Sequence, residues 1–257
     1  MKPIISMSTL RGIPVADSIA LAVKCGFGGI EIQTDYLPEE DAETAAVFQR
    51  ARDAGLEVSL HAPCGDINIS ALNRGIREES VRQVMQTIDL AARYQVRTVT
   101  FHPGRLSSAR ENREEKWKVL IQAVSAISRY ALKRDVFVGL ENMEARKKEL
   151  VLTVEDLDRF ACLQNPRFGV TVDLSHFATN GITDPLKPRL PIHNIHISQC
   201  RDGKPHFPMQ DGGTVLTGAL EQWLENYDGC IVLELKSIRD PEIYRKSLQW
   251  LEKELGL

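Results

Sequence analysis

Carboxylate and imidazole side chains follow short apolar runs throughout this chain. In the run FGVTVDLSH, side chains alternate along a predicted strand, so Gly169, Thr171 and Asp173 share one face. The other face is apolar, and His176 follows three residues after the carboxylate. A carboxylate at the end of a buried strand is costly to desolvate unless another group pairs with it. We therefore expect a group that pairs with the Asp173 carboxylate, such as a cation, in the same site.

Five further predicted strands end in, or close to, a side chain of the same kind. These side chains are His61, His102, Glu141, His196 and Glu234. A lone histidine is more often a packed or surface residue than a ligand, but four of the six histidines stand at or just past a predicted strand end. Imidazole and carboxylate groups together form a coordination shell for a divalent metal such as Zn²⁺, Mn²⁺, Co²⁺ or Fe²⁺. The pattern therefore predicts a metal site.

The elements that would position these residues form an alternating series. Eight short apolar runs are predicted strands: Pro3–Thr9, Gly29–Gln33, Glu57–His61, Arg97–His102, Val136–Glu141, Phe168–Asp173, Ile192–Ser198 and Cys230–Leu235. Seven amphipathic stretches are predicted helices: Ala16–Cys25, Ala42–Ala54, Glu79–Tyr94, Glu114–Lys133, Thr153–Ala161, Thr217–Asn226 and Asp240–Leu255. A Pro-rich crossover around Asp184–Leu190 takes the place of one helix.

This alternation predicts an α/β fold, a single (β/α)₈ TIM barrel over residues 1–257, because neither a linker nor a composition shift divides the chain. A doubly wound open sheet is the structural alternative. The loops that follow strands are the long ones, and they are Pro63–Arg77, Pro103–Asn112 and Gln199–Gly213. Barrel enzymes place their chemistry on this side.

Composition narrows the class of protein further. The 257 residues carry a net charge of −3, so no bulk basic field draws the chain to nucleic acid. The five cysteines contain no CxxC pair, which suits a reducing cytoplasm better than a disulfide framework. Neither a signal-peptide h-region nor an apolar run of membrane-spanning length is apparent. We expect a cytoplasmic protein without a membrane partner, and homo-oligomerisation stays open.

Six motifs together resemble the xylose isomerase-like barrel superfamily. They are HAPCGDINIS, FHPG, GLEN, VDLSH, HIH and the terminal LELK, and the resemblance covers nearly the whole chain. That superfamily includes sugar isomerases, ketose 3-epimerases, inosose dehydratases and isomerases, and an endonuclease IV branch. The order of the motifs is specific to the superfamily and not to one activity.

The resemblance to epimerase-like members implies one divalent metal ion, held by Glu141, Asp173, His196 and Glu234. It also implies substrate-binding roles, which we assign to His176, Arg201, His61, His102 and His206. In the endonuclease IV branch, by contrast, the positions of His61, His102 and His176 are metal ligands too, and up to three Zn²⁺ ions lie together.

The first hypothesis for function is an isomerase or epimerase acting on a sugar, sugar phosphate, polyol or inosose. The metal would stabilise an enediolate, and Glu141 and Glu234 would remove and return the proton as general base and acid. A metal-assisted dehydratase could use the same residues.

The second hypothesis is a zinc phosphodiesterase that acts on abasic-site DNA. Three features count against it. Lys204 stands where the endonuclease branch has an Asp, Cys64 stands where that branch has a DNA-wedging Tyr, and the chain is slightly acidic. These features argue against nucleic acid as a partner.

Three further questions are open from the sequence. The loop residues Arg74, Arg77, Arg105 and Arg110 are either ordinary solvated charges or a cluster for a sugar phosphate. Glu31 would point into the barrel, where it either contacts substrate or fixes a ligand histidine. A barrel that only binds a ligand is the non-enzymatic alternative, and the complete set of candidate metal ligands argues against it.

Overall fold

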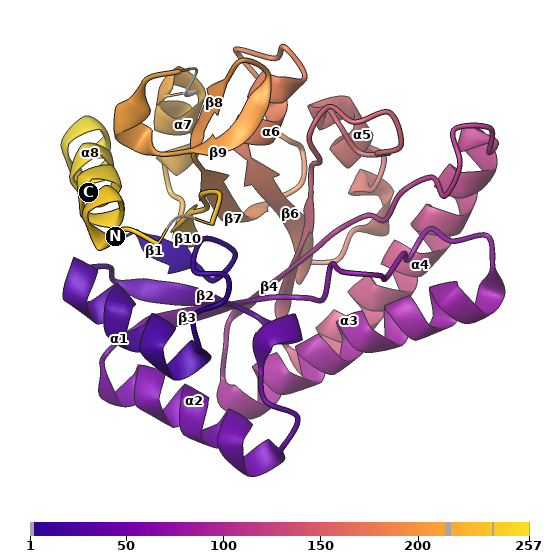
Figure 1. The fold of residues 1–257 in the computed structure, drawn as a ribbon. Coiled ribbons are helices and arrows are strands. Elements are labelled where there is room, and N and C mark those ends of the chain that lie inside the picture. Colours follow the sequence, from indigo (N-terminus) through magenta and orange to yellow (C-terminus); the bar gives the residue numbers. More distant parts are fainter. Residues whose placement is uncertain (1–2, 214–216, 238, 257) are drawn as a thin grey trace.

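Eight parallel strands close into a barrel in the computed structural model, which describes residues 3–213, 217–237 and 239–256 (Figure 1). Their order around the barrel is β1-β2-β3-β4-β5-β6-β7-β10, with β10 pairing back onto β1. Their bounds are β1 Ile4–Ser6, β2 Gly29–Gln33, β3 Glu57–His61, β4 Thr98–Phe101, β5 Phe137–Glu141, β6 Phe168–Asp173, β7 Ile192–Ile197 and β10 Cys230–Leu233. The predicted (β/α)₈ barrel is confirmed.

The helices lie outside the barrel or over its ends (Figure 1). Their bounds are α1 Val15–Cys25, α2 Asp41–Asp53, α3 Arg74–Tyr94, α4 Arg113–Arg134, α5 Val154–Asp158, α6 Leu174–Thr179, α7 Thr217–Leu224 and α8 Pro241–Leu255. Three short 3₁₀ turns cover Thr34–Tyr36, Ala161–Leu163 and Met209–Asp211. In the part of the chain that the structure describes, no helix is both long and apolar enough to cross a membrane.

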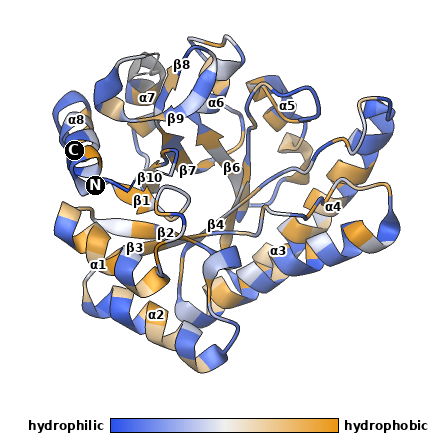
Figure 2. Ribbon diagram, in the orientation of Figure 1, coloured by the Kyte–Doolittle hydropathy of each residue, from blue (hydrophilic) through white to orange (hydrophobic). Residues whose placement is uncertain are grey.

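The hydrophobic core fills the layer between the strands and the helix ring. The outward residues of the strands are fully buried there, as at Leu60, Val99, Leu140, Val172 and Ile195. Figure 2 shows hydrophobic and hydrophilic residues alternating along α1 to α4, as expected for helices with one face on the core. Burial of this layer supplies the main stabilisation of the barrel.

The barrel interior is polar beneath the carboxyl ends of the strands. Glu31, Ser59, Thr100, Thr171 and Asn194 point inward from five strands and are at most 1% exposed. The hydroxyl groups of Thr100 and Thr171 lie 2.9 Å apart, and Asn194 Nδ2 donates to Thr100 Oγ1 over 3.1 Å. These hydrogen bonds satisfy side chains that would otherwise be costly to bury, and they form the platform beneath the strand ends.

The start of one helix and the end of one strand differ from those predicted. The helix expected from Glu79 begins at Arg74, because Asn73 Oδ1 caps it by accepting from the backbone N–H of Ile76 over 3.2 Å. The first strand ends at Ser6 and not at Thr9, since the backbone N–H of Thr9 donates back to the carbonyl of Ser6 and turns the chain.

Two predicted loops contain regular structure. The short helix α6 follows β6 directly, where no helix was expected, because Asp173 Oδ1 accepts from the backbone N–H of His176 over 2.8 Å and caps it. The predicted loop after β7 contains the hairpin β8 (Gln199–Arg201) and β9 (Lys204–Phe207). Asp202 and Gly203 both have positive φ at its turn, as a two-residue hairpin loop requires.

Candidate metal centre

Four side chains meet at the carboxyl ends of β5, β6, β7 and β10. Glu141, Asp173, His196 and Glu234 each offer one atom to a group whose members all lie within 4.8 Å of one another. The strand register explains the meeting, since Asp173 and Val232 are both the partners of His196 in adjacent strands. The structure therefore brings together the four residues predicted as metal ligands.

The atoms of this group suit a divalent cation. Asp173 Oδ2 is buried and has no hydrogen-bond partner among the described residues, and the buried His196 Nδ1 faces Glu234 Oε2 at 2.9 Å and Glu141 Oε1 at 3.3 Å. A buried polar atom without a partner is costly, and an oxygen and an imidazole nitrogen beside two further carboxylates form a donor set that binds a divalent transition metal. The four residues fit the predicted metal.

The two carboxylate oxygens of Asp173 have different roles. Its Oδ1 atom accepts from Ser175 Oγ over 2.7 Å and from the backbone N–H of His176. Asn142 holds the adjoining backbone, because its side-chain amide donates to the Asp173 carbonyl over 3.0 Å and accepts from the Asp173 N–H over 2.8 Å. These contacts fix one carboxylate oxygen and leave Oδ2 directed into the site.

Two further histidines flank Glu141. His61 Nε2 lies 3.3 Å and His102 Nε2 lies 3.1 Å from Glu141 Oε2, and these three residues form a second group with potential ligand atoms within 4.8 Å. His61 Nδ1 is 2.7 Å from the carbonyl of Ala62, which fixes its ring. The side chain of His102 is 28% exposed, so this edge of the site faces the outside.

A third group lies beside Asp173. His176 Nδ1 is 2.8 Å from the carbonyl of Asn142, and His176 Nε2 is 3.2 Å from His206 Nε2. His206 reaches this place from β9, with its Nδ1 atom 3.2 Å from the carbonyl of Glu234. Asp173, His176 and His206 therefore form another set of potential ligands.

Charges in the site are coupled through these contacts. Burial alone would lower the pKa of His61, but the hydrogen bond to Glu141 and the charge of Glu31 raise it to about 9. Burial likewise opposes protonation of His196, whose pKa is nevertheless raised well above its usual value by Glu31 and Glu141. Imidazolium groups thus balance the carboxylates, and a bound cation would replace their protons.

The two glutamates are held in their charged form. Burial would raise the pKa of Glu141, but His196 and His102 hold it well below its usual range. Burial would also raise the pKa of Glu234, and the hydrogen bond from His196 lowers it. Both residues are therefore anionic, as metal ligands must be.

Arg201 is the predicted site residue that the structure does not bring into the cluster. It lies on the hairpin strand β8, its side chain is 55% exposed, and its ion pair is with Asp202 at 3.9 Å. A substrate-binding role for Arg201 stays a prediction.

Two residues that were not expected in the site support it. Ser8 Oγ donates to Glu234 Oε1 over 2.8 Å and so positions this carboxylate. Ser175 binds Asp173 as described above. Ser8 follows β1, but the predicted strand Pro3–Thr9 included it, so no strand-end signal in the sequence identified this residue.

Comparison with known proteins agrees with this architecture. A family model described as "Xylose isomerase-like TIM barrel" matches residues 19–254. An uncharacterised protein of Methanocaldococcus jannaschii is 25% identical over 185 residues, which are 71% of this chain and 68% of the relative. A second uncharacterised protein of that organism is 27% identical over 199 residues, which are 72% of this chain and 66% of the relative.

Three solved structures share the fold. A D-tagatose 3-epimerase-like protein has a TM-score of 0.82 at 23% identity, over 100% of this chain and 97% of the other. D-psicose 3-epimerase with D-tagatose, from Clostridium cellulolyticum H10, has a TM-score of 0.81 at 15% identity, over 100% and 99%. The IOLI protein with a zinc atom has a TM-score of 0.75 at 17% identity, over 99% and 96%.

Proposed function

The chain belongs to the xylose isomerase-like TIM barrel family, and we propose that it is a divalent-metal-dependent isomerase or epimerase of a small sugar or polyol. The observation that carries this proposal is the meeting of Glu141, Asp173, His196 and Glu234 at the strand ends. The similarity to solved epimerase structures supports it at the level of the fold.

The four residues would hold one divalent ion. When bound, such an ion supplies Lewis-acid stabilisation of the negative charge that develops on two neighbouring substrate oxygens during removal of the C–H proton. The identity of the metal, among Zn²⁺, Mn²⁺, Co²⁺ and Fe²⁺, is left to measurement.

Glu141 and Glu234 would move the proton. They approach the site from β5 and from the end of β10, so a substrate carbon between them meets one carboxylate on each side. One carboxylate would remove the proton and the other would return it. Return to the same carbon inverts its configuration, and return to the neighbouring carbon moves the carbonyl group. Ser8 holds Glu234, while His61 and His102 hold Glu141, so each carboxylate has a fixed direction.

The test is exchange of substrate hydrogen with solvent. Protein loaded with manganese is incubated in D₂O with a panel of ketoses and inososes, and NMR follows deuterium at the carbon beside the carbonyl. We expect exchange with at least one compound, its loss after chelation, and its return with added metal. Exchange that is indifferent to metal removal would contradict the proposed chemistry.

One observation favours the second candidate, a zinc phosphodiesterase. The three potential ligand groups share members, because Glu141 belongs to two of them and Asp173 to two. Such sharing is the arrangement that a cluster of two or three metals needs. Cleavage of a DNA duplex with one abasic site by zinc-loaded protein would establish this activity, and the metal count described in the Discussion separates the two candidates.

A further inference from the structure

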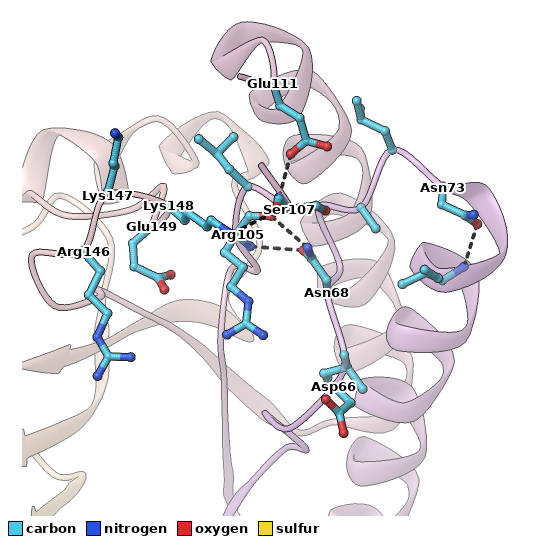
Figure 3. Close-up of a pocket in the computed structure, with 15 residues that line it drawn as sticks. Asp66, Asn68, Asn73, Arg105, Ser107, Glu111, Arg146, Lys147, Lys148 and Glu149 are labelled. Atoms are coloured by element: carbon cyan, nitrogen blue, oxygen red, sulfur yellow. Dashed lines mark hydrogen bonds between the residues drawn. The ribbon is translucent and has the colours of Figure 1, made fainter. Parts of the chain in front are cut away.

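A cavity of about 630 Å³ lies beside the metal centre, between the loops that follow β3, β4 and β5 (Figure 3). Neither the proposed metal ligands nor the proposed acid and base line it. Its basic residues are Arg105, Arg146, Lys147 and Lys148.

A smaller cavity of about 50 Å³ lies between this space and His102, a neighbour of the candidate metal centre. It is lined by His102, which contacts Glu141, and by Cys64. It shares Asn68, Arg105 and Glu149 with the larger cavity, so the two lie side by side. A substrate whose reacting end lies at Glu141 could therefore extend past His102 to Arg105.

The charges of the larger cavity favour an anion near Arg105. The guanidinium of Arg105 has no carboxylate within ion-pair distance among the described residues, whereas Arg146 pairs with Glu144 at 2.6 Å. In Figure 3 the Arg105 and Arg146 side chains extend in the same direction, and the ammonium group of Lys147 points the opposite way.

Three carboxylates also line the cavity, and one of them, Glu111, is held by other groups. Glu111 Oε2 lies 3.2 Å from the fully buried Lys116 Nζ and accepts from the Ser107 N–H over 2.6 Å. Glu149 is 7% exposed, and burial raises the pKa of its carboxyl group. Asp66 is exposed at the rim.

The three loops are joined to each other, which makes the cavity a rigid structure. Asn68 Nδ2 donates to the carbonyl of Arg105 over 2.8 Å, and Asn68 Oδ1 accepts from the Arg105 N–H over 3.1 Å. The Leu106 N–H donates to the carbonyl of Lys148 over 2.9 Å, and Arg105 forms a β-bridge with Glu149. Arg105 is thus presented by a backbone that is fixed on both sides.

We propose that this cavity binds an anionic group, a phosphate ester or a carboxylate, at the end of the substrate remote from the reacting carbon, with Arg105 as its ligand. A guanidinium suits both anions because its N–H groups form a planar fork that matches two oxygens. The inference rests on the proposed function, and it selects sugar phosphates or sugar acids over neutral sugars. Binding energy from the remote anion would orient the substrate at Glu141 and Glu234.

The test compares ligands that differ only in the anion. Calorimetry measures binding of a ketohexose, its 6-phosphate and the corresponding sugar acid to manganese-loaded protein. We expect the better anion to bind about ten-fold more tightly than the neutral sugar, as one charge-assisted contact provides. Arg105→Gln should remove most of this preference. Arg110→Gln is the matched control, because Arg110 is exposed in the same loop and does not line the cavity.

Each result of the calorimetry supports or overturns the proposed anion site. Tighter binding of the phosphate identifies a sugar phosphate, and tighter binding of the acid identifies a sugar acid. Equal binding of all three ligands, equal loss in both variants, or no binding of any ligand overturns the proposed anion site. Deuterium exchange on the same ligands separates the two proposals. Exchange without anion preference refutes the anion site alone, and anion preference without exchange refutes the isomerase alone.

Discussion

Glu31 Oε2 lies 3.1 Å from His196 Nε2 inside the barrel, and both side chains are fully buried. Glu31 comes from β2 and His196 from β7, across the barrel interior. The contact turns the other ring nitrogen of His196, Nδ1, toward Glu234 at 2.9 Å and Glu141 at 3.3 Å. Of the two roles that the sequence left open for Glu31, the contact with His196 supports the fixing of a histidine of the candidate metal centre.

Replacement of Glu31 should therefore weaken metal binding. Glu31→Gln keeps the size of the side chain but removes the charge that makes His196 a stronger donor. We expect a loss of about 10- to 100-fold in metal affinity, which is typical when the carboxylate behind a ligating histidine is changed. Competition with a chelator measures it. Glu39→Gln, an exposed change in the loop after β2, is the control. Equal affinities of the two variants would show that Glu31 does not act on the metal.

The number of bound metal ions distinguishes the two candidate functions. After dialysis against Mn²⁺ or Zn²⁺, mass spectrometry should find about one ion per chain, because one group of four ligands is the most complete. Glu141→Ala should lose the ion, while His102→Ala should retain it. His193→Gln, at the start of β7, is the control histidine change. Two or three zinc ions, reduced in number by His102→Ala, would instead support the phosphodiesterase.

The ion pair of Lys116 with Glu111 should stabilise the loop that carries Arg105. Lys116 is fully buried, while Glu111 is 20% exposed. Glu111→Gln leaves a buried ammonium without its partner and should lower the free energy of unfolding by about 3–5 kcal/mol. Lys116→Met should cost less, because the remaining carboxylate is partly solvated and keeps its backbone donors. Urea denaturation measures both.

The control for that pair lies on the surface. Glu79 and Arg82 are an exposed ion pair in α3, so Glu79→Gln should leave the free energy of unfolding nearly unchanged. A cost for Glu111→Gln as small as that of Glu79→Gln would mean that the buried ion pair does not hold the loop.

His193 should make the fold sensitive to acid. Burial, together with the charge of Arg97, lowers the pKa of His193 to about 4 in the folded protein. Its pKa in the unfolded chain is about 6.5, so below that pH the unfolded chain takes up a proton that the folded protein does not. Stability is therefore lost as pH falls from about 6.5 toward about 4, and this residue contributes about 2 kcal/mol of loss between pH 7.5 and 5.

The measurement is urea unfolding of the wild type and His193→Gln at pH 7.5 and pH 5. Glutamine does not titrate, so the wild type should lose about 2 kcal/mol more than the variant between the two pH values. Other groups that titrate contribute equally to both proteins. Parallel losses would show that His193 is protonated in the folded protein as readily as in the unfolded chain.

The sequence alone determined the barrel and which residues form its candidate metal centre. Alternation along each strand put Glu141, Asp173 and His196 on the inward face at a strand end, and Glu234 directly follows β10. The carboxyl ends of parallel strands in a closed barrel all meet at one side. The alternation is a local periodicity, and the meeting of the strand ends follows from closure of a parallel barrel. Both can be predicted from the sequence without coordinates.

The tertiary structure alone decided which atoms meet. Glu31 is 165 residues from His196, and only the width and register of the barrel bring their side chains to hydrogen-bonding distance. The cavity at Arg105 depends on three loops that fix one another through Asn68 and through the bridge of Arg105 with Glu149. The places of Ser8 and His206 also depend on loop conformation. Such contacts join residues far apart in the chain and arise from packing. Local secondary-structure propensity therefore cannot predict them.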